Sequence, residues 1–154
     1  MNLIDVKSPA DLKGLSISEL TDLTAQARQA LMTKVSEHGG HFGPPMGAAE
    51  MIMALHYVFN SPVDKIVYDV SHQSYVHKMV TGRALAFLDH DHYDDVTGYT
   101  DPTESEHDFF NIGHTSTSIS LASGLATARN LKGDSENIIA IIGDGSLSGG
   151  EAFE

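Results

Sequence analysis

An aspartate between two glycines is the residue of this sequence best suited to metal chemistry. Asp144 lies in Gly143-Asp144-Gly145, directly after an apolar run that ends at Ile142. Ligands of open α/β sheets bind beyond the carboxyl ends of strands, and glycines let a ligand approach the backbone closely. A carboxylate oxygen is a hard ligand that Mg²⁺ prefers, together with phosphate oxygens and water. Asp between glycines is also a common turn residue, so both interpretations stay open at this point.

Three histidines stand at the ends of expected elements. His41 follows two glycines that end a helix, His72 follows a strand, and His114 precedes a helix. Each could donate to a phosphate oxygen or move a proton near neutral pH, and all three would lie on one rim of an α/β sheet. Each could instead fill a turn or cap a helix. The spacing does not suit a zinc site, because no two of them stand four residues apart on one helix.

Other polar residues carry weaker signals. His56 lies among apolar residues in mid-helix and is expected in the core. His90 and His92 could bind a transition metal or belong to a solvated loop. The hydroxyl groups of residues 115–118 could donate to a phosphate or cap the helix that they precede, and a cap is expected in either case.

The first part of the chain predicts two helices. A capping-box pattern over residues 16–19 starts the first one, and glycines 39–40 end it. Five apolar residues between them recur at steps of three and four and predict one buried stripe: Leu20, Leu23, Ala27, Leu31 and Val35. Residues 41–47 are rich in Gly and Pro and predict a turn. Residues 48–59 are apolar almost all round, which predicts a helix buried on most sides.

Two segments predict strands. Residues 65–70 are a short β-branched run, and residues 137–142 are apolar on both faces, as is typical of a central strand in a parallel sheet. The Asp- and His-rich residues 83–108 are expected to be mostly loop. Further helices are expected over three segments: after residues 71–75 up to about Gly82, over 115–130, and from Glu151 onwards.

The alternation of helix and strand predicts the α/β class with a parallel sheet flanked by helices. Two strands are few beside the ~5–6 of an average sheet, and the helix expected from Glu151 has no body. We therefore expect an incomplete sheet in a truncated chain. A small complete α/β domain is the alternative.

The composition describes a globular protein and argues against some functions. The 154 residues are enough for one domain with a core, and 41% hydrophobic with 19% charged residues argue against disorder. A net charge of −12 argues against binding to nucleic acids or anionic membranes, which need a basic face. The sequence has no apolar run of membrane-spanning length, no secretory-signal pattern and no cysteine. A cytoplasmic location without disulfides is expected.

Several segments occur in an order that resembles the 1-deoxy-D-xylulose-5-phosphate synthase family, which is part of the transketolase-like thiamine-diphosphate enzymes. They cover most of the chain: His38–His41, Glu50–Phe59, Tyr68–Lys78, Glu104–Asp108, Gly113–Ser120 and Ile142–Gly145. Each segment is unspecific alone, and together they are highly specific. The resemblance implies that residues 1–154 form the truncated N-terminal part of a thiamine-diphosphate-binding domain.

The resemblance implies a role for each matching residue. Asp144 would bind Mg²⁺, and His41 would face the reacting substrate and help to move protons. Six residues would contact thiamine diphosphate: His72, Gly113, His114, Thr115, Gly145 and Ser146.

The reaction that the resemblance implies joins pyruvate, after loss of CO₂, to glyceraldehyde 3-phosphate. Its product feeds isoprenoid, thiamine and pyridoxal synthesis. The family implies a homodimer at full length, with neither nucleic acid nor membrane as a partner. The fragment alone is expected to have no turnover, because the family's second metal ligand, an asparagine, and the glutamate that activates the cofactor lie outside these residues.

Two departures from the family keep other readings open. The family has a basic pair before the segment 104–108, where this chain has Asp101-Pro102, and Pro45-Met46-Gly47 is closer to transketolase. Absent basic residues bear on recognition of the substrate phosphate. A transketolase-like enzyme with other ketose or aldehyde substrates is therefore one alternative, and a non-catalytic module that binds thiamine diphosphate is another.

Overall fold

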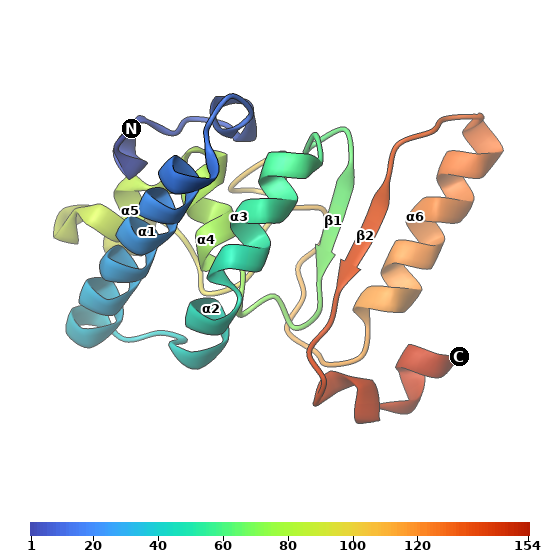
Figure 1. Ribbon diagram of the computed structural model, residues 1–154. Helices are drawn as coiled ribbons and strands as arrows, with labels where there is room; N and C mark the ends of the chain where they lie inside the picture. The colour runs from blue at the N-terminus through green and yellow to red at the C-terminus, as the bar shows by residue number, and fades with distance from the viewer. The chain divides into compact units, whose positions relative to one another are not determined.

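The computed structural model describes every residue from Met1 to Glu154, and its backbone divides into two compact units. Unit 1 comprises residues 1–60 and 73–98, and unit 2 comprises residues 61–72 and 99–154. Figure 1 labels the main helices and strands of both. None of the helices combines the length and apolar character needed to cross a bilayer.

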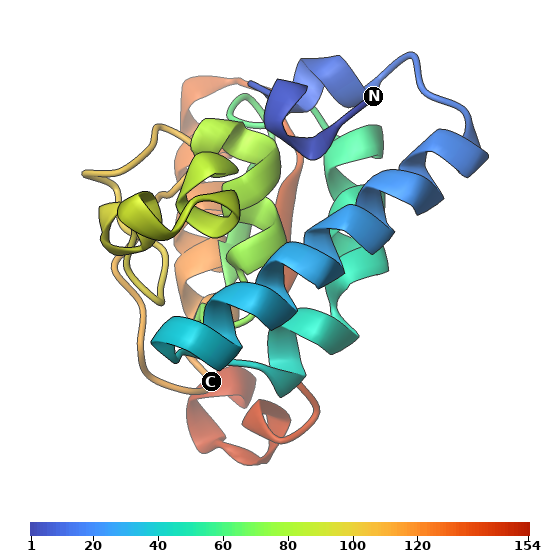
Figure 2. The same cartoon turned by 90° about the vertical axis from the view of Figure 1, so that its left-hand side faces the viewer.

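Unit 1 contains the longest helix, α1 (Ile17–His38), which packs against α3 (Ala49–Val58) (Figure 2). The predicted capping box is present, since the Ser16 hydroxyl accepts from the Glu19 N–H and the Glu19 carboxylate accepts from the Ser16 N–H. Of the predicted stripe, four residues are buried and Val35 is half-buried. The helix ends at Gly39, whose φ of +91° favours glycine. The prediction for this helix is confirmed.

Two predictions for the next segment are wrong in part. Residues 43–47 form a short helix, α2 (Gly43–Gly47), in place of a turn, because Pro44 and Pro45 lie in its first turn, where a missing N–H is tolerated. Helix α3 is buried on one face only: Met53 is 2% exposed, whereas Met51 is 45% and Val58 64% exposed. An apolar composition all round does not by itself supply a partner for every face.

Two fully buried histidines meet in the interior of unit 1. His56 of α3 is completely buried, as predicted. Its Nε2 lies 2.8 Å from Nδ1 of His77, which is equally buried, and the rings stack with centroids 5.0 Å apart. His77 belongs to α4 (Tyr75–Lys78), so this contact joins α3 to α4.

Short helical turns make up the rest of unit 1. Two 3-10 turns, η1 (Leu3–Asp5) and η2 (Pro9–Leu12), precede α1. Helix α4 continues into a π-helical turn, η3 (Met79–Arg83). Two further elements fall in the segment expected to be loop: α5 (Leu85–Leu88) and the 3-10 helix η4 (His90–Asp95). Most of residues 83–108 lie outside helices and strands, so the expectation of mostly loop is confirmed. The two short elements were not predicted, because neither is long enough to display an apolar period.

Unit 2 is a parallel strand pair with one helix against it. Strands β1 (Lys65–Tyr68) and β2 (Ile138–Ile141) pair in parallel, and α6 (Ser118–Lys132) packs beside them (Figure 1). The register runs from Lys65 opposite Ile138 to Tyr68 opposite Ile141. The predicted α/β class, the two strands and their parallel direction are confirmed.

The core of unit 2 lies between the strands and α6. Three residues are buried together there: Val67 of β1, Ala122 of α6, and Ile112 from the loop before α6. Partly buried apolar residues pack around them: Phe110, Leu121, Leu125, Ile138 and Ala140. After β2 come two 3-10 turns, η5 (Ser146–Ser148) and η6 (Gly150–Phe153), in place of the helix expected from Glu151.

Candidate functional site

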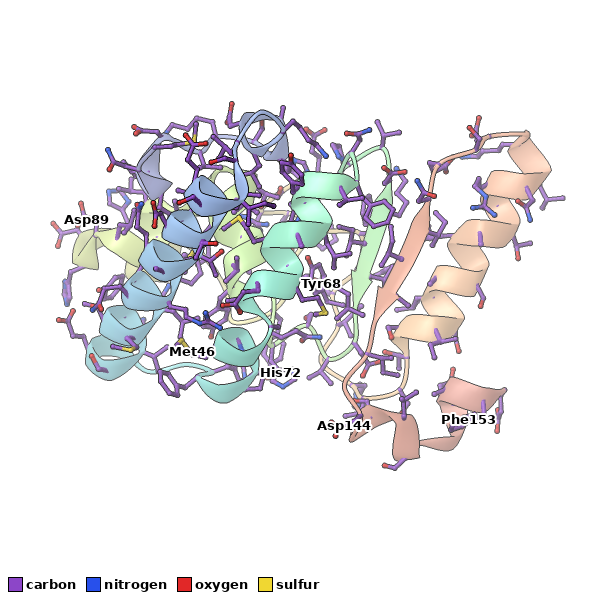
Figure 3. All side chains as sticks on the ribbon, viewed as in Figure 1. Met46, Tyr68, His72, Asp89, Asp144 and Phe153 are labelled. Atoms are coloured by element: carbon purple, nitrogen blue, oxygen red, sulfur yellow. The ribbon has the colours of Figure 1, made fainter.

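Asp144 lies in the turn after β2, as predicted. The residue is exposed, and its Oδ1 accepts from the backbone N–H of Gly145 at 2.9 Å. A Cβ atom placed on Gly143 or on Gly145 would meet nothing within 4 Å. The backbone on both sides of the carboxylate is therefore open to a ligand. Figure 3 shows Asp144 and His72 at the same end of the strand pair.

The described chain contains no cluster of three or more His, Cys, Asp or Glu side chains arranged to hold a metal ion. A single carboxylate still fits Mg²⁺, which commonly takes one or two carboxylates together with phosphate oxygens and water. The alternative metal site at His90 and His92 gains no support. Nδ1 of His92 lies 2.7 Å from the Asp95 carboxylate, and this hydrogen bond raises the pKa of His92.

The loop before α6 is built differently from the expectation. The N-cap residue, Thr117, makes no capping hydrogen bond with its side chain, and its hydroxyl donates instead to the carbonyl of His114 at 3.2 Å. The capping oxygens come from Asp69, at the end of β1. Oδ1 of Asp69 accepts from the Ser116 N–H at 2.9 Å, and Oδ2 accepts from the Ser118 N–H at 3.0 Å. The predicted local cap is wrong, because the carboxylate of Asp69, distant in the sequence, accepts the N–H groups at the start of the helix.

The Asp69 side chain is ionised in this setting. The residue is 1% exposed, and burial alone would raise the pKa of its carboxyl group. The backbone N–H groups of Ser118 and Ser116 outweigh burial and hold the pKa below its ordinary value, and the side chains of Ser146 and Ser118 lower it further. The carboxylate also faces the N-terminal end of α6, where the helix dipole favours negative charge.

Two residues of strained backbone follow Asp69. Val70 and Ser71 have φ values of +57° and +69°, a region that β-branched residues in particular avoid. The Ser71 hydroxyl is buried, donates to the Ile112 carbonyl at 2.8 Å and accepts from the Thr100 N–H at 3.0 Å. His72 follows this turn and lies half-buried beyond the end of β1.

Ser116 connects the loop before α6 to the loop after β2. Its hydroxyl donates to the Ser146 carbonyl at 2.6 Å, and its φ is +71°. A Cβ atom on Gly149 would lie 1.9 Å from the Ser116 Oγ, so no side chain fits at that glycine. We call the three connected segments 69–72, 113–118 and 143–149 the rim of unit 2.

The predicted cofactor residues of unit 2 all lie on this rim. Gly113, His114 and Thr115 form an exposed turn. A hollow of about 270 Å³ opens beside it, lined in part by Gly113, His114, Ser120 and Glu151, whose carboxylate accepts from the Ser120 hydroxyl at 3.0 Å. The rim thus combines an open backbone, hydroxyl and imidazole donors and one exposed carboxylate.

His41 belongs to unit 1, where a tyrosine contacts it. The His41 N–H donates to the Tyr75 hydroxyl at 3.1 Å, and the same hydroxyl lies 3.3 Å from His41 Nδ1. A hollow of about 270 Å³ beside them is lined in part by Lys34, His38 and Phe87. Sequence reasoning missed both Tyr75 and Asp69. Both stood inside the matching segment Tyr68–Lys78, but nothing in the sequence marked either side chain as a contact of a site residue.

Comparison with known proteins decides the family. A family model described as 1-deoxy-D-xylulose-5-phosphate synthase matches residues 3–154. The chain belongs to this family. Curated proteins of that name are 53% identical in Caldanaerobacter subterraneus subsp. tengcongensis and 51% identical in Chlorobaculum tepidum, each over 152 residues. A third, in Shouchella clausii, is 51% identical over 154 residues. The matches cover 99–100% of this chain and 24% of each relative's own length.

Within this member of the 1-deoxy-D-xylulose-5-phosphate synthase family, Asp101 has a structural role. The Asp101 carboxylate accepts from both the N–H and the hydroxyl of Thr103 at 2.8 Å. Its own N–H donates to the Asp108 carboxylate at 2.9 Å. These bonds close a turn over residues 101–108, which the aspartate organises.

Proposed function

We propose that this chain acts in a full-length protein that joins pyruvate, after decarboxylation, to glyceraldehyde 3-phosphate with the aid of thiamine diphosphate and Mg²⁺. The observation that most supports this proposal is the family match over residues 3–154. The chain spans 24% of the length of the relatives, so the proposed activity is that of the full-length protein. Residues 1–154 would form the N-terminal part of its thiamine-diphosphate-binding domain.

The rim of unit 2 fits the diphosphate of this cofactor and its metal ion. The exposed Asp144 carboxylate offers the hard oxygen that Mg²⁺ takes beside phosphate oxygens. The space next to Gly143 and Gly145 leaves the backbone accessible to a phosphate group. We infer that six residues contact thiamine diphosphate: His72, Gly113, His114, Thr115, Gly145 and Ser146.

The chemistry divides between the cofactor and the protein. When bound, thiamine diphosphate supplies the electron sink that decarboxylation requires. The protein's own residues bind and orient it, and we infer that His41 moves protons at the reacting substrate. The Tyr75 hydroxyl contacts both the backbone N–H and Nδ1 of His41 and would hold that ring in one orientation.

The remaining properties follow the family and the charge of the chain. We infer that the full-length protein is a cytoplasmic homodimer with small-molecule substrates. Its net charge of −12 in these residues opposes binding to nucleic acids and anionic membranes.

Calorimetry of the full-length protein tests the metal role of Asp144. We expect Asp144→Ala to weaken Mg²⁺-dependent binding of thiamine diphosphate by about tenfold or more, on the order of 1.4 kcal/mol. The matched control is Asp134→Ala, because Asp134 is also exposed and lies in the turn before β2 rather than after it. Equal binding by the wild type and Asp144→Ala would remove the proposed metal site.

A second candidate function is a transketolase-like reaction with another acceptor aldehyde. The observation that favours it is the Asp101 turn, which places an acid where the resemblance implies basic residues for the substrate phosphate. A screen of the full-length protein against phosphorylated and unphosphorylated aldehydes would separate the two candidates, because preference for an unphosphorylated acceptor contradicts the first. A non-catalytic module would bind the cofactor and turn over neither class.

A further inference from the structure

We propose that Asp69 is a positioning residue that fixes the three segments of the rim of unit 2 relative to one another. Its carboxylate and the Ser116 hydroxyl tie together the three segments that carry the proposed cofactor residues. The identity of the ligand rests on the proposed function. The fixed arrangement of the three segments rests on the hydrogen bonds described above.

The first tie joins the end of β1 to the start of α6. The two carboxylate oxygens of Asp69 each accept one backbone N–H, from Ser116 and from Ser118. Only a carboxylate offers two acceptor oxygens at this position, since an asparagine would turn an N–H₂ group toward one of the donors. Because both N–H groups are buried, leaving one without an acceptor costs about 1–3 kcal/mol. The turn with Gly113, His114 and Thr115 is thereby fixed relative to β1.

The second tie passes from the start of α6 to the loop after β2. Ser116 is 4% exposed and donates its hydroxyl to the Ser146 carbonyl at 2.6 Å. The missing side chain of Gly149 leaves the room that this hydroxyl occupies. The segment with Asp144, Gly145 and Ser146 therefore rests on the residue whose N–H Asp69 holds.

The third tie is the backbone of Asp69 itself. The strained turn at Val70 and Ser71 leads from the carboxylate directly to His72, and the Ser71 hydroxyl fastens it to Ile112. Strain of this kind persists only where the surroundings over-determine it, and it gathers at functional sites. One short segment thus sets the positions of residues from all three parts of the rim.

The start of α6 is therefore already occupied by a charge of the protein. The N–H of Ser118, the first residue of α6, and the N–H of Ser116 just before the helix both donate to Asp69 and are engaged before any anion arrives. Asp69 acts through the loops that it orders, and it does not itself contact the cofactor in this proposal.

Amide hydrogen exchange of the full-length protein without cofactor tests directly whether Asp69 fixes the rim segments. We expect Asp69→Asn to speed exchange in both segments 113–118 and 143–149. The matched control is Asp64→Asn. Asp64 is also buried and accepts from Asn137 at 2.7 Å, but it precedes β1 and so lies at the opposite end of the strand. Exchange in the two rim segments should stay unchanged in the control. Unchanged exchange in Asp69→Asn, or equal change in both variants, would overturn the proposal.

Cofactor affinity supplies the second readout. With Mg²⁺ present, we expect Asp69→Asn to bind thiamine diphosphate about tenfold or more weakly, and Asp64→Asn to bind it as the wild type does. Wild-type affinity in Asp69→Asn would overturn the positioning role. A wild type that does not bind thiamine diphosphate would refute the proposed function instead. The exchange experiment would still decide whether Asp69 fixes the rim segments.

A milder variant serves if Asp69→Asn fails to fold. Ser116→Ala removes the hydroxyl and keeps both N–H bonds to Asp69. We expect faster exchange in 143–149 alone, with 113–118 nearly unchanged. Unchanged exchange in 143–149 would contradict the second tie and with it the proposal.

Discussion

At the scale of single residues, Gly149 is the glycine of unit 2 with no room for a side chain. Gly149→Ala would place a Cβ atom 1.9 Å from the Ser116 Oγ, so the loop or the serine must move. We expect a loss of about 1–3 kcal/mol of unfolding free energy, the usual cost of overpacking. Denaturant unfolding of the full-length protein measures it. Gly150→Ala is the control, because a Cβ there meets nothing within 4 Å; equal stability of the two variants would contradict this explanation.

Asp69 also predicts a pH dependence. Its pKa is lower in the folded protein than the ordinary value of about 4. A carboxyl group of this kind stabilises the fold fully above its unfolded pKa, and that contribution is lost as the pH falls through the folded pKa. We therefore expect the stability difference between wild type and Asp69→Asn to be largest near neutral pH and to shrink below about pH 4. Unfolding measured over a pH series checks this, and a difference that grows toward acid would be inconsistent with it.

At the scale of elements, the sequence predicts those whose signals are local. The capping box and apolar stripe of α1, and the apolar runs of β1 and β2, are visible in consecutive residues. The elements α2 and α5 are too short to show a period. The cap of α6 is invisible for another reason, since Asp69 stands 47 residues before the Ser116 N–H that it accepts. Contacts between distant segments leave no mark in a local pattern.

The same limit applies to the candidate site. The positions of Asp144 and His72 just beyond the ends of strands were predictable from the apolar runs before them, whereas their roles toward a ligand stay a prediction. The neighbours that fix the site residues, such as Tyr75 beside His41, depend on how the chain packs. Their identity therefore came only from the structure.

The two faces of α3 allow a direct test of the packing. Met53 is 2% exposed and Met51 is 45% exposed, and both belong to one helix. We expect Met53→Ala to lower the unfolding free energy by about 2–5 kcal/mol. Met51→Ala should change it by no more than about 0.5 kcal/mol. Denaturant unfolding of the full-length protein measures both, and a similar cost for the two would mean that the outer face is covered as well.

At the scale of the whole molecule, the rim of unit 2 supplies one exposed carboxylate, that of Asp144, and the chain has no cluster of three or more metal-binding side chains. We therefore expect residues 1–154 expressed alone to show no turnover of pyruvate, and the full-length protein to release CO₂ from it. A decarboxylation assay with thiamine diphosphate and Mg²⁺ compares them. Measurable turnover by residues 1–154 would show that these residues hold a complete active site.

The buried histidine pair of unit 1 has a consequence of its own. Nε2 of His56 and Nδ1 of His77 face each other at 2.8 Å, so one of these nitrogens carries the proton between them and the other accepts it. The tautomers of the two rings are therefore coupled, and a change in one imposes a change in the other. This shielded imidazole proton should give a resolved, slowly exchanging NMR resonance. Its lifetime would report how often α3 and α4 separate.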